Sequence, residues 1–90
     1  MDALSKPRSA STGRYNISAI ERAIAILNLF SRERSLMTLD EITRDTGLSK
    51  STAFRVLATL EQHGYVVVDE NSGKYRLGAI FLSLGSAVLT

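Results

Sequence analysis

Apolar residues between positions 38 and 64 fall at helical spacing in two stretches separated by a three-residue break. In the second stretch they recur three and four residues apart, as they do on the buried face of a helix. They are Ala53, Val56, Leu57 and Leu60. Ile42 and Leu48 complete the set that two helices crossing at a tight turn would bury against each other. The pattern predicts two short helices packed across a turn.

Polar residues mark where each of these helices begins and ends. Thr38 and Glu41 stand three apart, the spacing of a capping box, so we expect the first helix to begin at the residue after Thr38. Gly47 would end it, because glycine adopts the left-handed conformation of a helix C-terminus at low cost. Ser49 can cap a second helix that runs to Gly64. The short turn between the two makes this a helix-turn-helix.

After the second helix the period of the pattern changes to that of a strand. Residues 65–69 and 74–77 indicate two short strands joined by a turn at residues 71–73. Alternation along the second strand puts Lys74 and Arg76 together on its outer side. A helix-turn-helix followed by a hairpin with a basic outer side is typical of a winged helix, a mainly α fold with a small β-hairpin.

The exposed side of the second helix carries small polar and basic residues. Its outward arc consists of Ser51, Arg55, Ala58 and Gln62, flanked by Thr52 and Thr59. Short hydroxyls and a long guanidinium near a helix start suit a surface that approaches the phosphates and base edges of duplex DNA. We therefore predict DNA contacts from the helix caps, the second helix and the hairpin. The predicted set is Thr38, Ser49, Lys50, Ser51, Thr52, Arg55, Thr59, Lys74 and Arg76.

An apolar helix is expected before this unit. Ser18 and Glu21 have the spacing of another capping box and would open it. Its expected core face consists of Ile20, Ala23, Ile24, Leu27 and Phe30. Ala19, Ile26 and Leu29 add a second apolar face, more than one small domain is expected to cover, which favours a partner chain.

The last segment, residues 79–90, is apolar over most of a helix circumference and carries no charge. Such a helix would promote aggregation if it were exposed, so we expect it to form a linker helix with dimer contacts. The predicted dimer or linker residues are Ile26, Leu29, Phe81, Leu84 and Val88. The alternative is that this helix packs on its own domain through Phe81 and Leu84.

Residues 17–84 closely resemble the N-terminal DNA-binding domain of IclR-type bacterial transcription regulators. The resemblance rests on the segments ISAIERAIAILNLF, LDEITRDTGLSKSTAFRVLATLEQHGYV and GKYRLG. It implies a winged helix at residues 17–78, with its second helix in the major groove and its hairpin on the backbone or minor groove. It also implies that residues 79–90 begin a linker helix to a missing effector-binding domain. We therefore expect this chain to be a cut-out domain, the alternative being an unusually short relative.

The same resemblance implies how the chain would act. Regulators of this type work in the bacterial cytoplasm as repressors or activators. A homodimer or higher homo-oligomer would bind palindromic or near-palindromic double-stranded DNA, because each protomer carries one recognition helix. A small-molecule effector would act only through the missing C-terminal domain.

The formal net charge of +2 comes entirely from residues 1–16, where Lys6, Arg8 and Arg14 stand against Asp2. The remaining residues hold eight basic and eight acidic side chains, so the folded part must bind DNA by the placement of its charges, with most acidic groups off the binding face. The first segment is polar, and we expect a disordered basic arm. Arg8 and Arg14 could contact the minor groove, as homeodomain arms do. The alternative is a solvated leader.

Composition argues against several other classes of function. The chain has no cysteine, and no apolar run approaches the about 20 residues of a membrane span. His63, the only histidine, suits a helix end better than a metal site or general base. The sequence therefore predicts no catalytic residue, metal, cofactor or membrane contact. A protein-interaction module remains an alternative, and RNA binding is a weaker one, because only Phe54 offers an aromatic ring near the candidate face.

Overall fold

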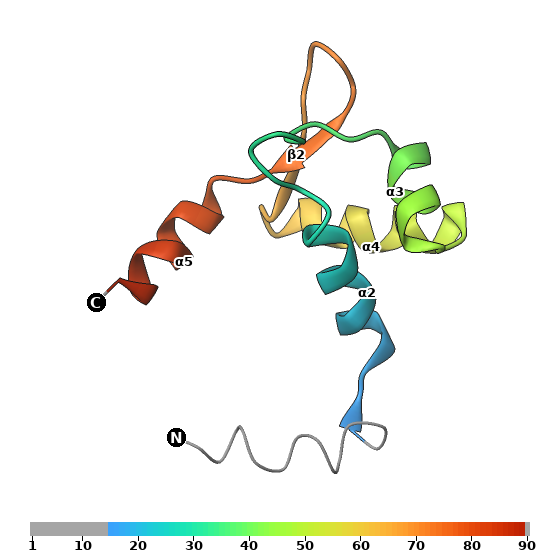
Figure 1. Cartoon of the computed structure of the whole chain (residues 1–90), viewed down its shortest axis with the longest axis horizontal. Coiled ribbons are helices and arrows are strands. Elements are labelled where there is room, and N and C mark those ends of the chain that lie inside the picture. Colours follow the sequence, from blue (N-terminus) through green and yellow to red (C-terminus); the bar gives the residue numbers. More distant parts are fainter. Residues whose placement is uncertain (1–14, 90) are drawn as a thin grey trace.

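The computed structural model describes residues 15–89, and these form four helices and one two-stranded hairpin (Figure 1). In chain order the elements are α2 (Ser18–Leu27), α3 (Leu39–Thr46), α4 (Lys50–Gln62), β1 (Val66–Val68), β2 (Tyr75–Leu77) and α5 (Ile80–Val88). α4 packs against α2, α3 and β1 and is the central element. The predicted helix-turn-helix with a following hairpin is confirmed. Residues 1–14, which include Arg8 and Arg14 of the predicted arm, lie outside the described residues.

The turn between α3 and α4 has the predicted caps. The Thr38 hydroxyl accepts from the Glu41 N–H at 3.0 Å, and the Glu41 carboxylate accepts from the Thr38 N–H at 2.8 Å. Gly47 ends α3 with a φ of 77°, a conformation that is strained for residues with a Cβ. The Ser49 hydroxyl accepts from the Thr52 N–H at 3.2 Å at the start of α4. Local hydrogen bonds therefore fix the turn that positions α4.

The hairpin is shorter than predicted, with three residues in each strand. Its antiparallel register pairs Val66 with Leu77, Val67 with Arg76, and Val68 with Tyr75. Val66 is fully buried against the helices, whereas Arg76 is exposed on the opposite face, as the alternation predicts. Residues 69–74 form the connecting turn, which is why the strands end early.

The segment before α3 adds a strand-like pairing that the sequence does not predict. Met37 exchanges two backbone hydrogen bonds with Tyr75 of β2, at 3.0 and 2.8 Å. Its side chain is fully buried in the same cluster as Ile42, the fourth residue of α3. The residue before a helix cap and the fourth helical residue meet in this way in a hydrophobic staple. Met37 therefore joins the hairpin to α3.

The core lies where α2, α3, α4 and β1 meet. Its buried side chains form one cluster, made of Ile26, Phe30, Met37, Ile42, Ala53, Leu57 and Val66. Val56 and Leu60 of α4 pack at its edge, as their spacing predicts. One face of α4 is thus occupied by the core, and the opposite face is left for solvent or a partner.

The start of α2 differs from the prediction. Ile17 is the residue at the helix cap, and no side chain forms a capping hydrogen bond there. Ser18 is the first helical residue, so its hydroxyl cannot serve as the predicted cap, which requires a residue with extended backbone geometry before the helix. The Ser18–Glu21 capping box is therefore wrong.

The face of α2 that enters the core agrees only in part with the prediction: Phe30 is buried and Leu27 packs against the core, as expected. Ile26 is fully buried and Leu29 packs against the core, whereas Ile20 and Ile24 are 56% and 51% exposed. Ile26 has no free surface, so its predicted role as a dimer contact is wrong, and Leu29 is half-buried inside the same domain. Apolar residues cover both faces of α2, and spacing alone could not decide which of them meets α4.

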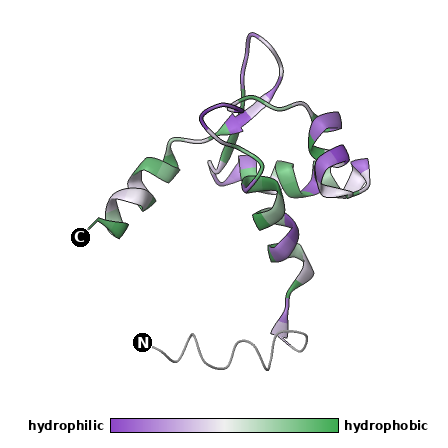
Figure 2. Ribbon diagram, in the orientation of Figure 1, coloured by the Kyte–Doolittle hydropathy of each residue, from purple (hydrophilic) through white to green (hydrophobic). Residues whose placement is uncertain are grey.

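α5 extends away from this core (Figure 1). Phe81 in its first turn packs edge-on against Tyr65, with ring centroids 5.4 Å apart and an interplanar angle of 84°. Phe81 is therefore a contact within the domain, as expected if this helix packs on its own domain. Beyond it, Leu82 is 79% and Val88 82% exposed, and Leu84 is exposed as well. Figure 2 shows the apolar character of this projecting helix.

The chain crosses itself where β2 leads into α5. Gly78 is buried, and its N–H donates to the Tyr65 carbonyl at 2.9 Å. A Cβ on residue 78 would collide with the carbonyl oxygen of Gly64, which lies just after α4. Only glycine fits this crossing without a shift of backbone.

Gly78→Ala is expected to destabilise the domain, because the new Cβ would force the two backbone segments apart. We expect the free energy of unfolding to fall by about 1 to 3 kcal/mol, the usual cost of overpacking. Gly85→Ala is the matched control, since a Cβ there meets no atom within 4 Å and alanine favours a helix. Urea denaturation followed by circular dichroism measures both variants. Equal unfolding midpoints for the two would contradict the crossing.

Candidate nucleic-acid interface

α4 presents the outward arc that the sequence predicts. Ser51, Arg55 and Thr59 are exposed, and Thr52 is half-buried toward α2. Phe54, at the edge of this arc, is 53% exposed and so lies outside the core. Because an α-helix fits the major groove of B-DNA, this face is sterically able to meet base edges.

Most of the predicted hydroxyl groups already form local hydrogen bonds. Thr38 and Ser49 cap the two helices of the turn. The Ser49 hydroxyl also donates to the Thr52 hydroxyl at 3.0 Å, and the Thr59 hydroxyl donates to the Arg55 carbonyl at 3.1 Å. These bonds restrict the side-chain rotamers along α4, so the outward arc is pre-organised.

Acidic residues of α3 lie closer to the predicted cations than we expected. Lys50 forms an exposed ion pair with Asp40, with Nζ 3.1 Å from Oδ1. The Thr38 N–H lowers the pKa of Glu41 by hydrogen bonding, and nearby cations, Lys74 among them, lower that pKa further. The side chain of Lys50, the first residue of α4, thus reaches the first turn of α3. Lys50 is therefore partly neutralised within the chain.

The turn of the hairpin is closed by Asp69 and Ser72. The Asp69 carboxylate accepts from the hydroxyl and the N–H of Ser72 at 2.8 and 2.9 Å, which lowers the pKa of Asp69. The Ser72 hydroxyl in turn accepts from the Lys74 N–H at 3.2 Å. Lys74 and Arg76 are both exposed beyond this ordered turn.

The two cations of the hairpin have different surroundings. Lys74 acts electrostatically on Glu41 at the start of α3. Arg76 instead lines a hollow with Phe30, Ser31 and Ser35, in the loop after α2. None of the predicted α4 residues lines this hollow, so Arg76 and the α4 residues do not share one site.

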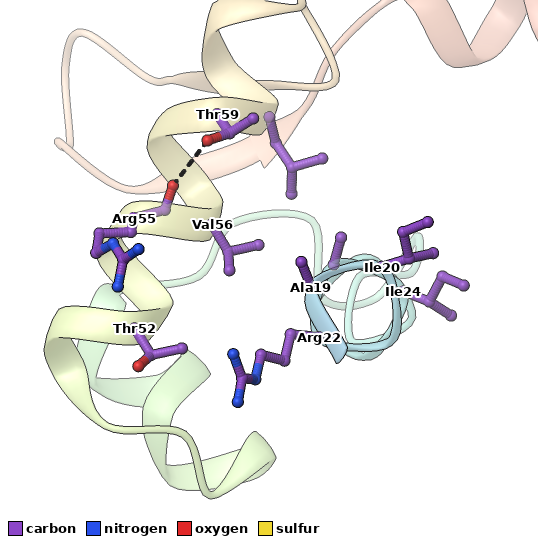
Figure 3. Close-up of a pocket in the computed structure, with 10 residues that line it drawn as sticks. Ala19, Ile20, Arg22, Ile24, Thr52, Arg55, Val56 and Thr59 are labelled. Carbon is purple, nitrogen blue, oxygen red and sulfur yellow. Dashed lines mark hydrogen bonds between the residues drawn. The ribbon is translucent and has the colours of Figure 1, made fainter. Parts of the chain in front are cut away.

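A groove of about 430 Å³ runs between α2 and α4 (Figure 3). The apolar side chains that line it include Ala19, Ala23, Val56 and Leu60. Thr52, Arg55 and Thr59 border it from α4, and Arg22 extends from α2 toward Thr52. Two guanidinium groups from different helices thus border the same groove.

Arg22 is absent from the residues predicted for the interface. It stands four residues before Ile26 and therefore on the same face of α2. Once Ile26 is known to enter the core beside α4, Arg22 must lie one turn earlier along that contact. The spacing of Arg22 and Ile26 is visible in the sequence. It could not place Arg22 beside α4, because Ile26 was not predicted to enter the core.

Within residues 15–89 no group of three or more His, Cys, Asp or Glu side chains is placed to hold a metal ion. His63 lies at the C-cap of α4, as predicted, and its backbone N–H donates to the Thr59 carbonyl at 3.3 Å. No helix in this part of the chain has the length and apolar character needed to cross a membrane.

Known proteins with similar sequences share this domain. Residues 19–70 match the IclR helix-turn-helix domain. The glycerol operon regulatory protein of Streptomyces coelicolor is 43% identical over 74 residues, which cover 82% of this chain and 29% of that protein. The HTH-type transcriptional regulator XynR of Escherichia coli is 40% identical over 73 residues, which cover 81% of this chain and 29% of that protein.

Solved structures give the same result. An IclR family transcriptional regulator from Brucella abortus superposes with a TM-score of 0.78 and 31% identity, over 99% of this chain and 34% of that one. An IclR transcriptional regulator from Alicyclobacillus acidocaldarius has a TM-score of 0.74 and 32% identity, over 82% of this chain and 30% of that one. The chain thus spans about a third or less of each relative's length. The domain match, the identities and the shared winged helix together show that the chain belongs to the IclR family of transcriptional regulators.

Proposed function

We propose that this chain binds double-stranded DNA sequence-specifically, as the DNA-reading part of a bacterial transcriptional regulator. The proposal rests on the exposure of Arg55: its side chain lies on the outward arc of α4 and forms no ion pair within residues 15–89. A guanidinium at this position can donate two hydrogen bonds to a guanine edge in the major groove. Family membership supports this role, because the relatives named above are regulatory proteins.

In the proposed complex α4 enters the major groove and the hairpin meets the backbone or minor groove. Ser51, Thr52 and Thr59 are short enough to let the helix approach the bases closely. Lys74 and Arg76 would contact phosphates, which position a protein on DNA without reading its sequence. Lys50 would exchange its contact with Asp40 for a phosphate, since that ion pair is exposed and weak.

Regulation by a small molecule is proposed only for residues outside the winged helix. The relatives extend well beyond the matched region, which makes up 29% of the Streptomyces coelicolor protein. Repression or activation would follow from the position of the DNA site relative to a promoter. Because the target is genomic DNA, the proposed place of action is the bacterial cytoplasm.

We also propose that the chain acts as a dimer. The exposed side chains Leu82, Leu84 and Val88 of α5, and Ile20 and Ile24 of α2, are apolar. Full burial of one such side chain contributes about 1.5 to 3 kcal/mol relative to exposure. Contact between α5 of one protomer and the exposed face of α2 of its partner would cover both surfaces. A two-fold dimer carries two α4 helices and would fit a palindromic or near-palindromic site.

Binding to duplex DNA is expected to be strongly salt-dependent. The slope of log K against log salt should be about −0.9 for each phosphate that the chain neutralises. Fluorescence anisotropy with labelled duplexes at several salt concentrations measures it. The double variant Lys74→Ala/Arg76→Ala should bind every duplex more weakly and with a shallower slope, because both side chains are assigned to phosphates.

Two outcomes would count against this prediction. If the unmodified chain shows no affinity for any duplex at low salt, the DNA-binding proposal fails and a protein-interaction module becomes the better explanation. An unchanged salt slope in the double variant would mean only that the hairpin does not touch DNA.

Arg55→Ala should reduce sequence discrimination at one position in each half-site. A bidentate arginine–guanine pair provides about 1 to 3 kcal/mol of discrimination between bases. Selection of binding sites from a random duplex library, with the variant and the unmodified chain in parallel, measures the loss. Arg32→Ala is the matched control, because it removes the same charge from an exposed loop position. Equal weakening on all sequences would assign Arg55 to a phosphate.

Sedimentation velocity should detect a dimer of the unmodified chain at micromolar concentration. Ile24→Glu and Val88→Glu should each shift it toward monomer, because both place a charge on the surface proposed to be covered. Phe54→Glu is the control, since Phe54 is similarly exposed but lies on α4. A monodisperse monomer of the unmodified chain at its highest soluble concentration would refute the dimer.

A further inference from the structure

We propose that Arg22 binds a backbone phosphate of the DNA on which α4 docks. The inference rests on the proposed function and gives a role to a residue from outside the helix-turn-helix. Arg22 projects from α2 across the groove toward Thr52, and Arg55 borders the same groove from α4 (Figure 3). Both cationic groups therefore lie along one edge of the helix that would enter the major groove.

Neither of these guanidinium groups is neutralised by the described part of the chain. The ion pairs found within residues 15–89 engage Arg34, Arg44 and Lys50, and none engages Arg22 or Arg55. Two like charges beside one groove repel each other, so the free domain gains nothing electrostatically from placing them there. A polyanion lying against both would reverse the sign of that interaction.

Position distinguishes the roles of the two arginines. Arg55 comes from the helix that would lie inside the major groove, so it is placed to reach a base edge. Arg22 comes from the flanking helix, and the phosphates of each strand form the rim of the major groove. Its neighbours on the groove side, Ala19 and Ala23, are small and leave room for a sugar-phosphate strand to approach. A long side chain from this position meets the rim and not the bases.

The proposed contact would orient α4. Phosphate contacts fix the register and angle of a protein on the duplex, whereas base contacts provide discrimination. Arg22 on α2 would hold one DNA strand beside α4, and the cations of the hairpin would hold the DNA backbone at a second place. Arg22 would therefore limit rotation of α4 about its own axis and keep Arg55 directed at its base.

Arg22→Ala tests the inference in the whole 90-residue chain. We expect about tenfold weaker binding to every duplex, typical of the loss of one charge-assisted hydrogen bond, and a salt slope reduced by about 0.9. The thermal unfolding midpoint should not change, because Arg22 is exposed. Arg22→Lys should restore most of the affinity, since a point charge suffices for a phosphate. Arg32→Ala, which removes the same charge elsewhere, should have a smaller effect.

A methylphosphonate scan of the preferred duplex identifies the contacted phosphate. Neutralising that phosphate should weaken binding by the unmodified chain but have no further effect on Arg22→Ala. The inference is overturned if Arg22→Ala keeps the affinity and salt slope of the unmodified chain, or if its loss is confined to one base position. If the unmodified chain binds no duplex, the proposed function fails and this inference fails with it. If the unmodified chain binds DNA and Arg22→Ala binds with the same affinity and salt slope, only this inference is refuted and the proposed function stands.

Discussion

The backbone pairing of Met37 with Tyr75 is the constraint on which the rest of the domain depends. It gives β2 hydrogen-bonded neighbours on both sides, β1 on one and the segment before α3 on the other. The Met37 side chain meanwhile occupies the core with Ile42. An isolated hairpin with three residues in each strand would be marginal in water. Met37, together with Val66 of β1 in the core, makes the hairpin part of the same packed unit as the helix-turn-helix, so its cations keep a fixed position relative to α4.

The pairing of charges is more informative here than their sum. Residues 17–90 contain equal numbers of basic and acidic side chains, yet the ion pairs are not spread evenly. Asp45 pairs with Arg34 and Arg44, and Asp40 pairs with Lys50, all of them around α3. Exposed pairs of this kind contribute little to stability. Their effect is to select which cations remain available to a polyanion, and those remaining beside α4 include the two arginines of the α2–α4 groove.

Local signals allowed the helix-turn-helix to be predicted from the sequence. The capping box of Thr38 and the left-handed Gly47 act within a few residues, so the residues themselves determine the geometry. The face of α2 could not be predicted in the same way, because Ile24 and Ile26 are equally apolar and only the distant α4 decides between them. The Met37 bridge to β2 is likewise a contact between distant segments. The place of Arg22 beside α4 could not be predicted for the same reason, since it follows from that of Ile26.

The backbone crossing at Gly78 has a geometric consequence for any assembly built through α5. Gly64 follows the end of α4 and Gly78 shortly precedes α5, and these two residues touch through backbone atoms. With no side chain between them to adjust, the direction of α5 is set directly against the end of α4. In a dimer held by α5, this crossing would determine the separation of the two half-sites, while the side chains of α4 determine their bases. Operator spacing and base preference would then be encoded in different parts of the chain and could change independently.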